Sequence, residues 1–168
     1  MAQMFRVTNY RDTQQSWTFG FLLPPSSVRK DGPPEILSRE FFYGGHKWRL
    51  VFCKRDKCHL SPYLEICEMT KGVKCWVDYT FLLINSDSYT QNEKFSEKQR
   101  QFSADEPRHG ARIFISLDDL GSRVGFRDAR QYLVFEVTLK CIKTVFEALF
   151  SLADVGKTLH STRTVLYM

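Results

Sequence analysis

Cysteine and histidine side chains gather in the middle of the sequence, where they offer the ligand types of a zinc site. Cys53, Cys58 and His59 lie close together, and either Cys67 or Cys75 would complete a set of four. Structural zinc sites usually show paired Cys-x2–4-Cys knuckles. Cys67 and Cys75 are instead separated by seven residues. Ordinary thiols are therefore favoured over a metal centre, and no cofactor is expected.

Nucleophilic or acid–base catalysis would need a reactive pair of side chains. The chain has five cysteines and four histidines, but none stands in a local sequence typical of a cysteine enzyme. Asp118 and Asp119 are adjacent, so extended backbone would point them to opposite faces, which does not suit a shared acid–base pair. A capping role at a turn, together with Ser116, is favoured. The sequence therefore predicts a protein that is not an enzyme.

Basic residues raise the question of nucleic-acid binding. A series of arginines stands at Arg108, Arg112, Arg123, Arg127 and Arg130. Few aromatic residues alternate with them, and acidic residues separate the groups, so a solvated basic face is favoured over a stacking platform. The net charge of +5 and the pI of about 9.0 are only mildly basic, without a polybasic arm. No nucleic-acid partner is expected.

Length and composition indicate one globular domain. The 168 residues are 43% hydrophobic and 26% charged, which excludes wholesale disorder. No apolar stretch approaches the roughly 18 to 20 residues of a membrane span, and the first ten residues lack the pattern of a secretory leader. Five cysteines, an odd number, and no Asn-x-Ser/Thr acceptor favour a reducing compartment. We therefore expect an intracellular protein, cytoplasmic or nuclear, without a membrane partner.

The elements that must position these residues follow the period of a strand. The predicted strands are Ser16–Leu23, Trp48–Phe52, Leu60–Cys67, Trp76–Ile84 and Gln131–Ile142. Apolar and polar residues alternate in the shorter ones, while the last two are denser in aromatic and β-branched residues, as in central strands. Because no helix of useful length intervenes, the pattern predicts an all-β fold, an antiparallel sandwich.

The remaining segments are predicted as loops, a helix and a tail. Pro24–Pro34 and Asn85–Arg100 are polar and indicate loops. In Lys143–Leu159 apolar residues recur at offsets of three and four, which predicts a C-terminal helix ending near Gly156. The segment 1–15 could dock on the sheet or form a tail, and the sequence leaves this open.

The domain boundaries follow from these elements. We predict an N-terminal tail at 1–15, a β-sandwich at 16–142, and a C-terminal helix and tail at 143–168.

Several short sequence segments, taken in their order along the chain, resemble those of a known family. The strings are Phe42–Leu50 (FYGGHKWRL), His59–Leu64 (HLSPYL), Tyr79–Asn85 (YTFLLIN), Ile113–Leu120 (IFISLDDL), Gly125–Phe126 and Tyr132–Val137. In this order they resemble the MATH (meprin and TRAF homology) domain, over roughly Ser16 to Cys141. The resemblance implies an eight-stranded antiparallel TRAF-like sandwich, as in TRAF adaptors, meprins, certain deubiquitinases and BTB-containing ubiquitin-ligase adaptors.

The resemblance also implies a binding groove. Domains of this family take an extended partner segment in a shallow groove, in the manner of strand addition. The aromatic contacts of the speckle-type POZ protein pattern fall here on Tyr63, Tyr79 and Phe102. The two tyrosines could equally be cross-strand partners that cover the sheet.

One part of the family's groove pattern differs in this chain. The Trp-Gly-Phe triplet is replaced by His109, Gly110 and Ala111, so two aromatic walls are changed. Arg108, His109 and Arg112 would give a basic rim instead, because histidine titrates near neutral pH. A more acidic ligand than the family's serine-rich segments is therefore expected.

The sequence thus predicts a peptide-recognition module. Its expected peptide-binding residues are Tyr63, Tyr79, Phe102, Arg108, His109, Gly110 and Arg112. Its expected place is as the substrate-binding or scaffolding part of a ubiquitin-ligase or signalling assembly, a role that rests on the resemblance alone. The alternative is a structural or oligomerisation domain with a degenerate groove, acting through the C-terminal helix. The sequence leaves the oligomeric state open.

Overall fold

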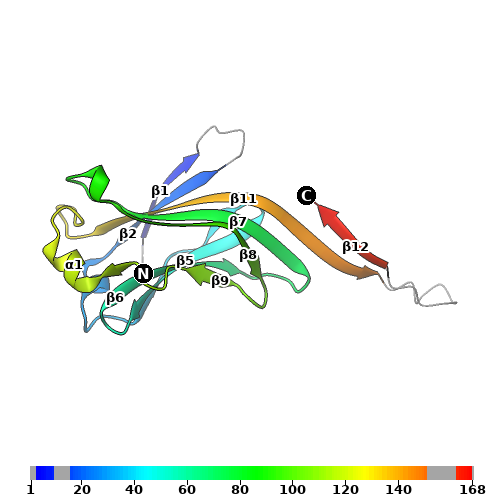
Figure 1. The fold of residues 1–168 in the computed structure, drawn as a ribbon, viewed down its shortest axis with the longest axis horizontal. Helices are drawn as coiled ribbons and strands as arrows, with labels where there is room; N and C mark the ends of the chain where they lie inside the picture. Colours follow the sequence, from blue (N-terminus) through cyan, green and yellow to red (C-terminus); the bar gives the residue numbers. More distant parts are fainter. Residues whose placement is uncertain (1–2, 10–15, 151–161, 168) are drawn as a thin grey trace.

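The computed structural model describes residues 3–9, 16–150 and 162–167, and they form two antiparallel sheets packed face to face (Figure 1). In sheet 1 the order is β1 (Gln3–Asn9), β2 (Trp17–Leu23), β11 (Leu133–Phe150), β7 (Val73–Leu83) and β8 (Glu93–Ser103), with β12 (Thr162–Tyr167) beside β11. In sheet 2 the order is β10 (Ile115–Ser116), β6 (His59–Cys67), β5 (His46–Arg55) and β3 (Glu35–Leu37), with β4 (Phe41–Tyr43) on β5 and β9 (Arg108–Gly110) on β6. The predicted all-β antiparallel sandwich is confirmed. Four of the described strands have only two or three residues, and eight have six or more.

Three short helical turns complete the described elements. They are η1 (Pro25–Val28), η2 (Tyr89–Gln91) and α1 (Leu117–Ser122). The Ser116 side chain caps α1, since its Oγ accepts a hydrogen bond from the Asp119 amide at 2.9 Å. Asp118 and Asp119 lie in the first turn of this helix. The capping role predicted for this segment is therefore confirmed for Ser116. No helix of the described part of the chain is long and apolar enough to cross a membrane.

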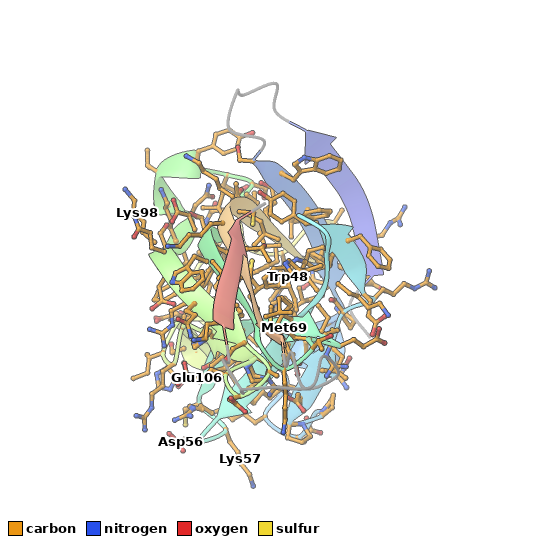
Figure 2. The ribbon with its side chains drawn as sticks, turned by 90° about the vertical axis from the view of Figure 1, so that its right-hand side faces the viewer. Trp48, Asp56, Lys57, Met69, Lys98 and Glu106 are labelled. Carbon is orange, nitrogen blue, oxygen red and sulfur yellow. The ribbon has the colours of Figure 1, made fainter. Side chains whose placement is uncertain are left out.

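A single core fills the space between the sheets. Along β7 every second side chain is buried, as strand alternation requires. Trp48 of β5 is 1% exposed, and its indole Nε1 donates to the Tyr43 carbonyl at 2.9 Å. Figure 2 shows Trp48 among the crowded side chains between the ribbons, whereas Lys57 and Lys98 extend outward. Aromatic contacts join the sheets, for example Phe52 of sheet 2 and Phe135 of sheet 1 at 4.9 Å between ring centroids.

Short hydroxyl side chains form a row across the outer face of sheet 1. Thr18, Thr138, Thr80 and Ser96 lie directly opposite one another on β2, β11, β7 and β8. The hydroxyl oxygens of Thr18 and Thr138 are 2.8 Å apart, and those of Thr80 and Ser96 are 2.9 Å apart. Cross-strand hydrogen bonds of this kind stabilise one register of the sheet.

The predicted C-terminal helix is wrong for residues 143–150, because they continue strand β11. These residues pair with β7 as far as Phe146 and with β12 from Val145 onward, and Figure 1 shows β11 running on past the sandwich to β12. A β-bulge between Cys141 and Lys143 explains the error. A bulge adds one residue to the strand, so the apolar positions that follow lose their two-residue alternation and imitate helical spacing. The rest of the predicted helix, 151–159, lies outside the described residues.

The predicted loop at Asn85–Arg100 is correct only in its first half. From Glu93 onward this segment forms β8, an outer strand of sheet 1. Charged side chains protect an edge strand from pairing with other chains. Such a strand therefore has the polar composition of a loop. This composition explains why the segment around Phe95 was predicted as a loop although it forms a strand.

The N-terminal segment also differs from the predicted tail. Gln3–Asn9 forms β1 and pairs antiparallel with β2, from Gln3 opposite Leu22 to Asn9 opposite Trp17. This part of 1–15 therefore docks on the sheet, and residues 1–2 and 10–15 lie outside the described part. The pairing of β1 with β2 shifts register between Met4 and Arg6.

Candidate functional site

The predicted binding residues fall around the place where the two sheets meet at one side of the sandwich. β8 is an outer strand of sheet 1 and β9 is an outer strand of sheet 2. A tight turn joins them, in which the Ser103 amide donates to the Glu106 carbonyl at 3.2 Å. Figure 1 shows β8 and β9 on the same side of the molecule. This turn brings residues of both sheets into one region.

Two of the predicted aromatic residues, Tyr79 and Phe102, lie in the core. They are 1% and 0% exposed, and their ring centroids are 6.1 Å apart. The Tyr79 hydroxyl donates to the Glu97 carboxylate, and burial, together with this bond, raises the pKa of Tyr79. Strand alternation places residue 79 on the inner face with Val77 and Phe81. In this structure neither ring is open to a ligand, which corrects the prediction that both line a groove.

Tyr63 is the aromatic residue of the predicted set that keeps accessible surface. It lies half-buried on the outer face of sheet 2, opposite Gly110 of β9. A Cβ added at Gly110 would lie 2.9 Å from Tyr63 Cδ1 and only 2.2 Å from the Pro62 carbonyl oxygen. Gly110 is therefore required for β9 to pack closely on β6 beneath the Tyr63 ring.

Arg108 lies on the same outer face and is held by two carboxylates. Its guanidinium donates to Glu35 at 2.8 Å and to Glu65 at 3.2 Å. Arg49 donates to the same Glu65 oxygen at 2.8 Å. Burial alone would raise the pKa of Glu65, but the hydrogen bonds and charges of Arg49 and Arg108 together lower it. The positive charge of Arg108 is thus matched within the protein.

His109 points to the opposite side of β9, because adjacent residues of a strand face opposite ways. It is 8% exposed, its ring lies 4.8 Å from that of Phe102, and its Nδ1 accepts from Arg100 Nε at 2.9 Å. Burial, and then the positive charge of Arg100, lower the pKa of His109. His109 is therefore neutral at neutral pH, and it does not form a basic rim with Arg108.

Two exposed arginines supply the positive charge near β9. Arg112 follows β9, and its carbonyl accepts from Ser61 Oγ at 2.7 Å. Arg100 of β8 is exposed and is oriented by His109. Within the described part of the chain, neither forms an ion pair. Arg100 was missed because its segment was predicted to be a loop, and the alternation of Glu93, Phe95 and Glu97 with more exposed neighbours is the signal that would have identified the first half of the strand.

The backbone of β9 has one unpaired edge. The Ile66 amide donates to the Pro107 carbonyl at 2.9 Å, and the Ala111 amide donates to the Pro62 carbonyl at 3.0 Å. In an antiparallel pair every second residue bonds the neighbouring strand, so the N–H and C=O groups of Arg108 and Gly110 point away from β6. No other described strand pairs with β9. The arrangement is an edge that can accept an added strand.

The cysteines and the histidine considered as metal ligands do not lie close enough together to form a metal site among the described residues. Among residues 3–9, 16–150 and 162–167 no group of three or more His, Cys, Asp and Glu side chains is placed to hold a metal ion. Cys53, Cys58 and Cys67 are free thiols of sheet 2 or its β5–β6 turn.

Comparisons with known proteins identify the family of this sandwich, which is a family of protein-interaction modules. Residues 5–133 match the family model of the MATH domain, so the chain belongs to the MATH domain family. In fold the chain is similar to TRAF5 of Notothenia coriiceps, with a TM-score of 0.52 and 13% sequence identity over 83% of this chain and 77% of that chain. A search of curated proteins found no match. The resemblance stated from the sequence strings is confirmed.

Proposed function

We propose that this protein-interaction module binds an extended segment of a partner protein by adding it as a strand to β9. The observation that carries the proposal is the unpaired backbone edge at Arg108 and Gly110, next to the half-exposed ring of Tyr63. In strand addition the main-chain hydrogen bonds supply affinity, and side chains at alternate positions supply specificity. Tyr63 would contact the side chains of the partner that lie on the outer face of sheet 2.

The charges around β9 favour an acidic partner segment. Arg108 is already paired with Glu35 and Glu65, so its contribution to the attraction is small. Arg100 and Arg112 are exposed and form no ion pair in the described part of the chain. The basic rim would therefore consist of Arg112, which was expected from the sequence, and Arg100, which takes the place of Arg108 and His109. Exposed charges are screened over about 10 Å at 0.1 M salt, so affinity should fall as salt is added.

A role in a ubiquitin-ligase or signalling assembly is part of the same proposal. It is supported only by membership of the MATH family. The chain would act there as the substrate-binding or scaffolding part, and the acidic segment would belong to the protein that is recruited.

The alternative of oligomerisation through a C-terminal helix has lost support. Residues 143–150, which would form the first half of that helix, belong to strand β11. No observation on the described residues favours this alternative over strand addition.

The test is a binding screen of the purified chain against extended peptides at low salt, followed by affinity measurements on the peptides that bind. Arg112→Glu is the diagnostic variant, and Arg130→Glu, at an exposed arginine of the Arg127–Gln131 turn, is its charge-matched control. We expect enrichment of acidic peptides, an affinity loss of roughly tenfold or more in Arg112→Glu, and little change in Arg130→Glu.

Two outcomes would contradict the proposal. One is the absence of enrichment above the background of Arg112→Glu. The other is an equal loss in both variants, which would indicate unspecific attraction between charges. Tyr63→Ala, checked by its thermal melt, adds a third comparison, because it removes the ring without changing the charge.

A further inference from the structure

The β-bulge of β11 creates a cluster of reactive side chains that the proposed function does not use. Cys141 lies opposite Val77 and Thr144 lies opposite Cys75, with the register shift between them. In a regular strand, residues three positions apart face opposite sides of the sheet. The extra residue of the bulge brings Cys141 and Thr144 to the same side, beside Cys75. Bulges commonly redirect a side chain in this way at functional sites.

The two sulfur atoms of this cluster are within reach of a disulfide bond. The distance between Cys75 Sγ and Cys141 Sγ is 3.7 Å, and a disulfide requires about 2.05 Å. The two cysteines lie on hydrogen-bonded neighbouring strands, so the sulfurs can approach by side-chain rotation with little backbone movement. Both are free thiols in this structure.

The neighbours of the thiols make Cys141 the more reactive of the two. The hydrogen bond between the thiols lowers the pKa of Cys141 and raises the pKa of Cys75. Thr144 Oγ1 lies 4.0 Å from Cys141 Sγ and 3.1 Å from His46 Nε2. A lowered pKa raises the fraction of Cys141 present as thiolate, and the thiolate is the form that oxidants attack.

Cys141 is also partly accessible, whereas Cys75 is fully buried. Gly44 of the β4–β5 turn lies beside it, and a Cβ added there would be 3.2 Å from Cys141 Cβ and 3.5 Å from its sulfur. The absence of a side chain at Gly44 therefore leaves one approach to this sulfur uncovered. Redox-responsive cysteines are accessible and often lie next to a second thiol that can form the disulfide, and Cys141 and Cys75 have this arrangement.

We propose that Cys75 and Cys141 are a redox-responsive pair that forms a reversible disulfide when a peroxide reaches Cys141. The Cys141 thiolate attacks one oxygen of hydrogen peroxide, the O–O bond breaks, and the thiol becomes a sulfenic acid as hydroxide leaves and takes up a proton to form water. The Cys75 sulfur then attacks Cys141 Sγ, the S–O bond breaks, and the hydroxyl leaves with the Cys75 proton as a second water molecule. Two thiols are oxidised and one peroxide is reduced.

The bond would fix the strand at the place where it leaves the sandwich. β11 pairs with β2 only as far as Leu139, and its pairing with β12 begins at Val145. The Cys75–Cys141 disulfide lies between these two parts and would hold the outer half of β11 against β7. The pair is in sheet 1 and the β9 edge is in sheet 2, so this inference does not depend on the proposed function.

Peptide mapping of the full chain under non-reducing conditions tests the proposal. After treatment with hydrogen peroxide and blocking of remaining thiols, we expect a cross-linked peptide pair that contains Cys75 and Cys141 and is released by dithiothreitol. Cys58→Ser, which removes an exposed thiol, should give the same cross-link. In Cys75→Ser, a dimedone adduct on Cys141 should accumulate because the second thiol is missing.

A wild-type chain in which oxidation is confined to Cys53, Cys58 or Cys67 would overturn the proposal. Hydrogen exchange provides the second measurement, because the cross-link should slow exchange of the amides of residues 143–146 at least several-fold, reversibly. A cross-link that leaves this exchange unchanged would overturn the inferred fixing of β11.

Discussion

Tyr63 and Tyr79 lie on consecutive strands that belong to different sheets. They differ in how much of the side chain is exposed, and this difference gives them different roles. Tyr79 is 1% exposed and packs between Phe81 and Phe102, whereas Tyr63 is half-buried on an outer face. Removing a large buried aromatic side chain costs about 3 to 5 kcal/mol. We therefore expect Tyr79→Ala to lower the free energy of unfolding by about that amount, as measured by urea denaturation.

Phe42→Ala is the matched control for this prediction, because Phe42 is 71% exposed. Its effect should stay within about 0.5 kcal/mol. Similar losses in the two variants would contradict the assignment of Tyr79 to the core.

His109 should make stability depend on pH just below neutrality. Burial, and then the charge of Arg100, lower its pKa below 6.5, and burial lowers the pKa of His46 in the same direction. The unfolded chain then binds more protons than the folded chain, so stability is lost as the pH falls through the unfolded value of 6.5. In urea denaturation at several pH values, His109→Phe should lose less stability between pH 7 and 5.5 than the wild type. Equal slopes for both proteins would refute the role of His109.

The family resemblance predicted residues that lie near one another around β9, but it did not predict the direction in which their side chains point. Arg108 and His109 are neighbours in sequence, and extended backbone turns them to opposite faces. The partners that neutralise Arg108, Glu35 and Glu65, come from two other strands. Such contacts between distant segments have no signal in a single sequence, so the basic rim could be predicted only in part.

At the scale of elements, the outer half of β11 distinguishes the structure most clearly from the sequence prediction. Lys143 to Phe146 pair with β7 from Trp76 to Val73. Amides in a ladder exchange slowly, so hydrogen exchange of the reduced protein should show protected amides within 143–146, and the chemical shifts of these residues should be those of a strand. Helical chemical shifts at these residues would contradict the strand and support the predicted helix.

The β4–β5 turn offers a matched pair of substitutions. Gly44 and Gly45 have φ of +60° and +78°, where a side chain costs about 1 to 2 kcal/mol. A Cβ at Gly45 would meet nothing within 4 Å, whereas one at Gly44 would lie 3.2 Å from Cys141 Cβ. Thermal melts should therefore show Gly45→Ala destabilised and Gly44→Ala destabilised further. A smaller effect at Gly44 would contradict its close approach to Cys141.

Strands with one clear buried face were predictable, and the others were not. Ser16–Leu23, Leu60–Cys67 and Trp76–Ile84 coincide closely with β2, β6 and β7, because large apolar residues stand at every second position in each segment of the sequence. β8 has the charged composition of an edge strand, and β11 has a bulge. Both features follow from the position of a strand within the sheet, which the local sequence does not contain.

At the scale of the whole molecule, the shared core should make the two sheets unfold together. Phe135 of sheet 1 contacts Phe52 of sheet 2 and is fully buried. Phe135→Ala should lower the free energy of unfolding by about 3 to 5 kcal/mol. Tryptophan fluorescence and far-ultraviolet circular dichroism should report one coincident transition for both proteins. Separate transitions for the two signals would show that the sheets are independent.

The row of hydroxyl groups at Thr18, Thr138, Thr80 and Ser96 has a consequence for how the chain avoids errors while it folds. A slip of one residue in any of these four strands would turn a hydroxyl into the space between the sheets and an aromatic ring such as Phe19 or Phe81 out to water. The slipped sheet would lose a cross-strand hydrogen bond and apolar burial at the same time. Because both losses of stability occur in the same misaligned pairing, misaligned folding intermediates are less stable than correctly aligned ones. The row of hydroxyl groups therefore favours the correct alignment of the four strands.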